Sequence, residues 1–135
     1  MAEVLAADVP EMDERIQDCL PGHEIVFVRT LPEAISTLRH NRFSLVVIGL
    51  HFDESRMFEL LSHVRSLREY DQVPVVCIQG LEVVIPEGVI RTFDMAVKVL
   101  GGTAFVDLRH TALDFQRHCE FLDRTASAGR SLRPS

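Results

Sequence analysis

Five short apolar runs, separated by longer segments of helical periodicity, constrain this chain more than any other feature of its sequence. A strand buried on both faces of a parallel sheet is a nearly continuous run of Val, Ile and Leu, whereas a helix packed on one side has apolar residues at every third or fourth position. Alternation of the two patterns predicts repeated strand–helix units on a parallel sheet. We expect the strands at 3–7, 24–29, 44–50, 73–78 and 103–108.

Helices are expected between these runs and after the last one, at about 10–20, 31–41, 55–67, 87–100 and 110–122. Thr30, followed three residues later by Glu33, predicts a capping box at the start of the second helix. Asp53 or Ser55 is expected to cap the third helix, and Gly101 to end the fourth. The residues of the fourth helix expected to face the core are Val89, Phe93, Ala96, Val97 and Leu100. Five such units imply a doubly wound α/β domain. We therefore predict a three-layer sandwich whose five-stranded parallel sheet has the flavodoxin-like order 2-1-3-4-5.

The length of 135 residues fits one domain, which we place at residues 1–124. The remaining segment, 125–135, has almost no apolar content and is predicted to be a disordered tail. The apolar stretch LEVVI at 81–85 is open to two interpretations, a short additional strand or an apolar loop. As a loop it is either a buried flap or an exposed patch for a partner.

Composition and charge argue against nucleic-acid binding and against membrane contact. The net charge of −6 lacks the basic surplus that nucleic-acid binding requires. No signal-peptide pattern or membrane-length apolar run is present in the sequence, so we expect a cytoplasmic protein without membrane contact. Cys19, Cys77 and Cys119 are odd in number, widely spaced and form no CxxC pair, so we predict three unlinked, buried cysteines. The histidines have no metal-ligand spacing, and we expect no metal or cofactor.

The stretch LVVIGLHFDESRMFELL, residues 45–61, resembles the third strand and third helix of response-regulator receiver domains (CheY-like) from bacterial two-component signalling. In that family an apolar strand ends in an aspartate, and a short loop and an amphipathic helix follow. Element order and spacing agree over residues 3 to about 124. The resemblance implies the receiver fold, in which the strand-end aspartate accepts a phosphoryl group with the help of Mg²⁺.

The phosphoryl-transfer residues of the family are largely replaced. The residues at the family's pocket positions are Asp8, Val9, Gly49, His51, Gln79 and Leu108. Gly49 stands at the acceptor position, and glycine has no side chain to phosphorylate. Val9, Gln79 and Leu108 stand where the family has its second acid, its threonine or serine, and its lysine. The resemblance therefore implies an atypical receiver, or pseudo-receiver, with a degenerate pocket.

The leading hypothesis is a non-enzymatic signalling module that acts by protein–protein contact without phosphorylation. In the family the usual contact surface comprises the fourth helix, fifth strand and fifth helix, here about residues 87–122. Candidate residues on this surface are Arg91, Asp94, Lys98, Phe105, Arg109 and Asp114. The expected partner is a signalling or regulatory protein or a second copy of the chain. Phe105 matches the family's activation-reporting aromatic residue, but an aromatic residue in a strand usually serves core packing, which is the interpretation we favour.

Two alternatives remain open. In the first, the emptied pocket around Asp8, Gly49, His51 and Gln79 holds a small ligand or a metal, which makes the domain a sensor. In the second, a different carboxylate, such as Asp53, accepts the phosphoryl group.

Overall fold

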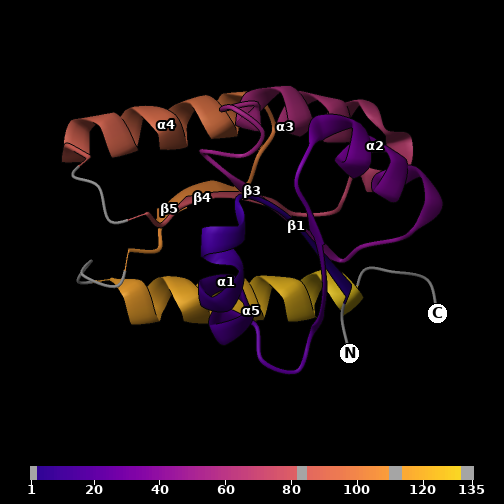
Figure 1. The fold of residues 1–135 in the computed structure, drawn as a ribbon, viewed down its shortest axis with the longest axis horizontal. Helices are drawn as coiled ribbons and strands as arrows, with labels where there is room; N and C mark the ends of the chain where they lie inside the picture. The colour runs from indigo at the N-terminus through magenta and orange to yellow at the C-terminus, as the bar shows by residue number, and fades with distance from the viewer. Residues whose placement is uncertain (1–2, 82–84, 110–113, 132–135) are drawn as a thin grey trace.

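The computed structural model describes residues 3–81, 85–109 and 114–131 (Figure 1). Its strands are β1 (Glu3–Ala7), β2 (Glu24–Val28), β3 (Leu45–Gly49), β4 (Val75–Gln79) and β5 (Ala104–Asp107). Its helices are α1 (Asp13–Cys19), α2 (Leu31–His40), α3 (Met57–Ser66), α4 (Glu87–Val99) and α5 (Phe115–Ser131). Single 3-10 turns, η1 (Pro10–Met12) and η2 (Arg68–Tyr70), precede α1 and follow α3.

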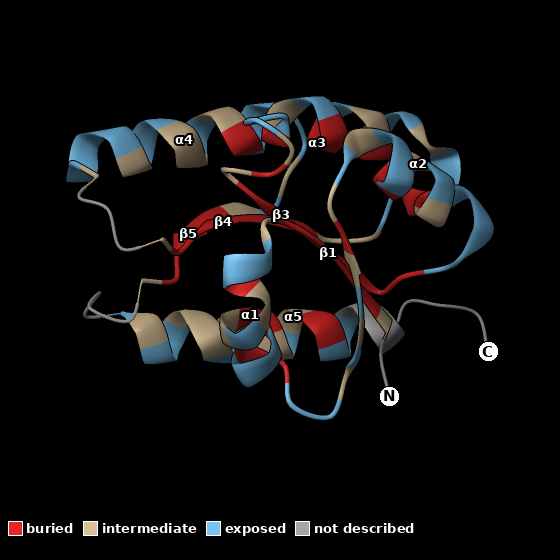
Figure 2. Cartoon of the chain, in the orientation of Figure 1, coloured by how far each residue is buried: buried red, intermediate tan, exposed pale blue. Residues whose placement is uncertain are grey.

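The strands form one parallel sheet in the order β2-β1-β3-β4-β5, which confirms the predicted topology. Helices α2, α3 and α4 cover one face and α1 and α5 the other (Figure 1). Alternate residues of a strand enter opposite cores, so Leu5 and Ala7 pack on the side of α2–α4, and Val4 and Ala6 on the side of α1 and α5. Figure 2 shows the buried sheet between helices whose outer faces are exposed.

Local sequence signals explain two helix ends. At the start of α2, the Thr30 hydroxyl accepts a hydrogen bond from the Glu33 amide at 3.3 Å, as predicted, and the Glu33 carboxylate accepts one from the Arg29 amide at 2.6 Å. After α4, Gly101 has a φ of 94°, a left-handed conformation that glycine adopts without strain. The Gly101 amide donates a hydrogen bond to the Lys98 carbonyl at 3.1 Å, and α4 ends where the sequence predicts.

The predicted cap of α3 is wrong. The N-cap residue is Arg56, and neither Asp53 nor Ser55 caps the helix. Asp53, Glu54 and Ser55 form a left-handed turn, with φ of 42°, 57° and 69°, whereas a side-chain cap requires an extended backbone. The Asp53 carboxylate instead accepts a hydrogen bond from the Leu31 amide at 2.7 Å, so it stabilises the first turn of α2.

The prediction of unlinked cysteines is also wrong for two of the three. Cys19, the last residue of α1, forms a disulfide with Cys119 of α5, with the two Cα atoms 4.5 Å apart. A sequence separation of 100 residues gave no sign of this contact, because it depends on α1 and α5 sharing one face of the sheet. Cys77 remains a free, buried thiol on β4, as expected.

The expected disordered tail is helical as far as Ser131, and Ala126 is fully buried in the core on the side of α1. Docking on the sheet thus extends α5 beyond what its apolar content indicates. Residues 82–84, within the LEVVI segment, and 110–113, where the last helix was expected to begin, lie outside the described residues. Within the described ranges, no helix is both long and apolar enough to cross a bilayer.

Candidate functional site

The carboxyl ends of the strands bring the predicted pocket residues to one edge of the sheet. The register pairs Ala7 with Ile48 and Gly49 with Ile78, and it places Gln79 directly beside Asp107. Asp8 follows β1 immediately and therefore lies level with Gly49. Open α/β sheets bind ligands at this edge, so these residues form the candidate site.

Asp8 occupies the space that a side chain at position 49 would need. A Cβ atom added to Gly49 would lie 2.0 Å from the Asp8 Cγ, far inside contact distance. The Asp8 side chain is almost fully buried, and its Oδ1 accepts a hydrogen bond from the Val9 amide at 2.8 Å. The Asp8 side chain can therefore occupy this position only because residue 49 has no side chain.

Burial raises the pKa of Asp8 from 3.8 to about 7, because the charged carboxylate loses hydration that its surroundings replace only in part. The Val9 amide and the Arg29 guanidinium act in the opposite direction, while the Asp13 carboxylate adds to the increase. Arg29 comes from the end of β2, donates to the Asp8 carbonyl at 3.0 Å and forms an ion pair with Asp13. Asp8 is thus a buried acid near its titration point at neutral pH.

Gln79 at the end of β4 and Asp107 at the end of β5 form a second group of polar side chains, and both are hydrogen-bonded to nearby residues. The Gln79 side chain donates to the Leu81 carbonyl at 3.2 Å and accepts from the Leu81 amide at 3.1 Å, so it is turned toward its own strand's exit. Asp107 binds the Arg109 guanidinium, with Nε 2.8 Å from Oδ2. His118 of α5 donates from Nδ1 to the Asp107 carbonyl at 2.8 Å.

The other predicted pocket residues do not add chemistry to this edge. Leu108, at the position of the family's lysine, is fully buried in the core beside α1 and α5. Val9 packs against the same core. The His51 Nε2 is buried and has no hydrogen-bond partner among the described residues. The structure thus brings Asp8, Val9 and Gly49 together, and it places Leu108, which the resemblance aligns with the family's lysine, in an apolar core.

The predicted interaction surface consists of α4, β5 and the start of α5. Arg91, Lys98 and Asp114 are exposed on it, as expected. Asp94 and Arg109 were expected to be exposed and are only partly so. The Asp94 carboxylate accepts a hydrogen bond from the Phe105 amide at 2.9 Å and pairs with Lys98, so it fastens α4 to β5.

Two aromatic rings lie beneath this surface. Phe105 is 4% exposed, and its ring centroid lies 5.4 Å from that of Phe93 on α4. Phe93 in turn stacks on Phe58 of α3 at 6.2 Å. Phe105 is therefore a core residue in this structure, and its ring is in direct contact with the helix that carries Arg91 and Lys98.

Sequence reasoning missed an exposed apolar stripe on α4. Met95 and Val99 are 67% and 84% exposed, and Val89 and Leu100, which were expected to face the core, are 41% and 40% exposed. Ile90, Phe93 and Val97 provide the inward face instead. The available signal was the excess of apolar positions in α4, since one helix face cannot bury all of them.

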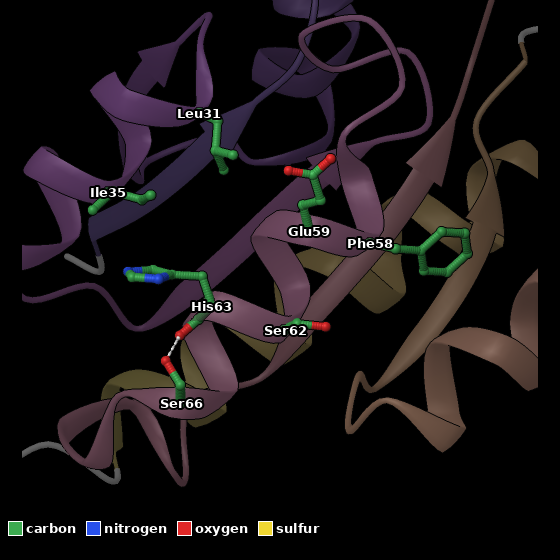
Figure 3. Close-up of a pocket in the computed structure, with 7 residues that line it drawn as sticks. All are labelled: Leu31, Ile35, Phe58, Glu59, Ser62, His63 and Ser66. Carbon is green, nitrogen blue, oxygen red and sulfur yellow. Dashed lines mark hydrogen bonds between the residues drawn. The ribbon is translucent and has the colours of Figure 1, made fainter.

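A surface groove of about 640 Å³ lies between α2 and α3 (Figure 3). Its lining residues are Leu31, Ile35, Phe58, Glu59, Ser62, His63 and Ser66. None of the predicted pocket residues lines it. No group of three or more potential metal ligands occurs within the part of the chain that the structure describes.

Comparison with known proteins supports the fold assignment. Neither a family model nor a curated protein sequence matches this chain. Among solved structures, the phosphorylated cyanobacterial phytochrome response regulator RcpA is 19% identical, with a TM-score of 0.73 over 94% of each chain. A response regulator from Hahella chejuensis is 16% identical, with a TM-score of 0.74 over 100% of this chain and 99% of that one.

The chemotaxis response regulator CheY4 of Vibrio cholerae is 19% identical, with a TM-score of 0.71 over 93% of this chain and 98% of that one. At these identities the similarity defines the fold. The chain has the flavodoxin-like architecture of response-regulator receiver domains, with five parallel strands in the order 2-1-3-4-5.

Proposed function

We propose that this chain is a non-enzymatic, receiver-like signalling module that acts through protein–protein contact without phosphorylation. The observation that carries the proposal is the packing of Asp8 against Gly49. A phosphorylated residue at that position would need a side chain and room for it, and the Asp8 carboxyl takes the room. Leu108, where a cation would be needed to stabilise phosphoryl oxygens, is buried among apolar residues.

Intact-mass measurement after incubation with acetyl phosphate and Mg²⁺ tests the first half of this proposal. We expect no phosphoryl adduct on the wild type or on Asp53→Asn. A receiver that retains the strand-end aspartate, treated in parallel, controls for the activity of the phosphodonor. A stable adduct on the wild type that Asp53→Asn removes would establish the alternative acceptor and contradict the proposal.

The second half of the proposal assigns the contact surface to α4, β5 and the start of α5. Two features support it: the exposed apolar stripe of Met95 and Val99, and the exposed cations Arg91 and Lys98 that flank it. Aromatic and apolar anchors with charged surroundings are the usual composition of protein interfaces. Phe105 connects this surface to the core through its contact with Phe93.

Charge reversal tests the surface. We expect the double variant Arg91→Glu/Lys98→Glu to lose the partner in affinity capture from native extract, or to lose self-association in sedimentation where the partner is a second copy. The matched control is Arg39→Glu/Arg42→Glu, which reverses two exposed arginines at the end of α2. If both double variants behave like the wild type, the contact surface lies elsewhere.

A further inference from the structure

The α1–α5 disulfide, between Cys19 and Cys119, joins two helices that cross in contact on one face of the sheet (Figure 1). Cys19 is 2% exposed, whereas Cys119 is partly exposed on α5. The Cα separation of 4.5 Å is within the range that a disulfide spans without moving the backbone. The bond therefore joins one buried residue, Cys19, to one residue that is partly open to solvent, Cys119.

A non-covalent contact accompanies the disulfide, between the segment that follows α1 and the next turn of α5. His23 follows Cys19 by four residues and Asp123 follows Cys119 by four, and the His23 Nε2 lies 2.7 Å from the Asp123 Oδ1. The surrounding apolar residues of both helices, Ile16 and Leu122 among them, are fully buried. These contacts do not depend on the disulfide, so the two helices have reason to stay docked when it is opened.

The third cysteine provides an internal contrast. Cys77 is fully buried on β4, and burial raises the pKa of its thiol to about 12. Because the thiolate is the reactive form of cysteine, this thiol is inert in the folded protein. Only the Cys19–Cys119 pair combines proximity, a common surface and access for an external thiol.

We propose that Cys19 and Cys119 form a reversible redox site that exchanges with low-molecular-weight thiols and sets how firmly α5 is held to α1. In the reducing direction, an external thiolate attacks the Cys119 sulfur, forms a mixed disulfide and releases Cys19 as a thiolate, which takes up a proton. A second external thiol then displaces Cys119. The products are two cysteine thiols and one external disulfide, and oxidation is the reverse.

The same turn of α5 connects the redox site to the proposed contact surface. His118, the neighbour of Cys119, donates to the Asp107 carbonyl at 2.8 Å, and the Asp107 carboxylate holds Arg109. Opening the disulfide removes the covalent restraint on α5 one residue from this connection. This consequence rests on the proposed function, because it concerns regulation of the α4–β5–α5 surface. Disulfides in reducing compartments are usually transient and redox-sensing, which suits a reversible bond in a protein expected to be cytoplasmic.

Thiol counting tests the redox site without any partner. The full chain is equilibrated with glutathione at several ratios of its reduced and oxidised forms, alkylated under native conditions and analysed by intact mass. We expect two alkylated thiols to appear together as glutathione becomes more reducing, with Cys77 labelled only after denaturation. A bond that never forms in oxidised glutathione, or that opens only when the protein unfolds, would overturn the proposal.

Thermal melting tests what the bond does to the fold. We expect the oxidised wild type to melt about 8 °C or more above the reduced protein, because the cross-link closes a long loop in the unfolded chain. Cys19→Ser/Cys119→Ser should melt at one temperature under both conditions. The matched control Cys77→Ala should keep the redox-dependent shift. A shift of the same size in the double serine variant would contradict the assignment.

Amide NMR of oxidised and reduced protein tests the connection to the surface. We expect the Arg109 and His118 amides to shift on reduction and Thr37 on α2 to stay unchanged. If the two-thiol transition occurs but reversal of Arg91 and Lys98 leaves partner capture intact, the proposed function fails and the redox site stands. If capture is lost in that variant but the thiol count never changes, the redox site fails and the proposed function stands.

Discussion

At the ends of β1 and β3, a buried carboxyl and a glycine share one space. Asp8 is held there by the Val9 amide and cannot be hydrated, which raises its pKa to about 7. Its protonation therefore changes in the pH range where most proteins are handled. At the carboxyl edge of the sheet, Asp8 is therefore a titrating group packed against Gly49 at the end of β3.

Asp8→Asn should remove a pH dependence of stability. Between pH 3.8 and about 7 the folded protein keeps a proton on Asp8 that the unfolded chain releases. The free energy of unfolding therefore falls as pH rises through this interval and stays lower above it. Asparagine keeps an oxygen for the Val9 amide but does not titrate. We expect Asp8→Asn to gain about 2–4 kcal/mol relative to wild type between about pH 4 and about pH 8.

Urea denaturation of both proteins across this range checks the prediction. Asp94→Asn serves as a control, because hydrogen bonds and the Lys98 ammonium outweigh burial and lower the pKa of Asp94, which gives the opposite pH trend. Parallel curves for wild type and Asp8→Asn would mean that Asp8 is charged in the folded protein.

Gly49→Ala should be destabilising out of proportion to its size. The added Cβ would lie 2.0 Å from the Asp8 Cγ, so Asp8 must leave its place or the strands must separate. We expect a loss of about 1–3 kcal/mol in chemical denaturation. Asp8→Ala in the same background should recover part of the loss, which a double-mutant cycle measures as coupling.

Gly88→Ala is the matched control for this substitution. Gly88 lies in α4, where an added Cβ meets nothing within 4 Å, so alanine should stabilise the helix by about 0.5–1 kcal/mol. Equal effects at positions 49 and 88 would show that the Asp8–Gly49 contact is not the reason.

At the scale of elements, the start of α2 depends on two side chains from different parts of the chain. Thr30 precedes the helix and caps its Glu33 amide, and Asp53 reaches the Leu31 amide from the loop after β3. Sequence reasoning identified Thr30, because its signal is local. It assigned Asp53 to the wrong helix, because a contact across 22 residues has no spacing rule.

Asp53→Ala should therefore weaken α2, not α3. We expect a loss of about 1–2 kcal/mol, from the hydrogen bond to Leu31 and from alanine's lower tolerance of the left-handed backbone at this position. Asp53→Asn should lose less, since asparagine keeps an oxygen acceptor and tolerates that backbone. Thr30→Ala should cost about 1 kcal/mol.

Hydrogen exchange of the α2 amides in these variants distinguishes the two helices. Faster exchange in α3 than in α2 on Asp53→Ala would contradict the assignment of Asp53 to the start of α2.

The sequence predicts the elements better than it predicts their surfaces. Buried strands such as β3 are continuous apolar runs, so their number and order were recoverable from alternation alone. The outward stripe of α4 was not, because a helix that carries apolar residues on two faces does not reveal which one meets the sheet. Val89 was expected to face the core, and no sequence signal indicated where Met95 would lie. Both side chains are exposed.

For the whole molecule, the sheet order was predictable and the cross-links between elements were not. The place of Gly49 at the end of β3 could be predicted from the apolar run that precedes it. That Asp8 fills the space it leaves, and that Cys19 meets Cys119, depends on how distant segments dock. Such contacts leave no periodic pattern in the sequence.

Hydrogen exchange of the backbone amides should distinguish the inner strands of the sheet from the edge strand β2. β1, β3 and β4 are flanked by strands on both sides and almost fully buried, so their amides should exchange only through global unfolding. β2 is an edge strand with Glu24 and Val26 exposed, so its amides should also exchange by local opening.

The α1–α5 disulfide acts mainly on the unfolded chain. It should therefore raise the free energy of opening, measured from amide exchange in β3 and β4, by about 2–4 kcal/mol and leave that of β2 nearly unchanged. The comparison is between the oxidised wild type and Cys19→Ser/Cys119→Ser, measured by hydrogen–deuterium exchange and mass spectrometry. Cys77→Ala, oxidised, controls for loss of a cysteine within the sheet. If β2 slows as much as β3, the sheet opens only as one unit and the edge strand has no local route to exchange.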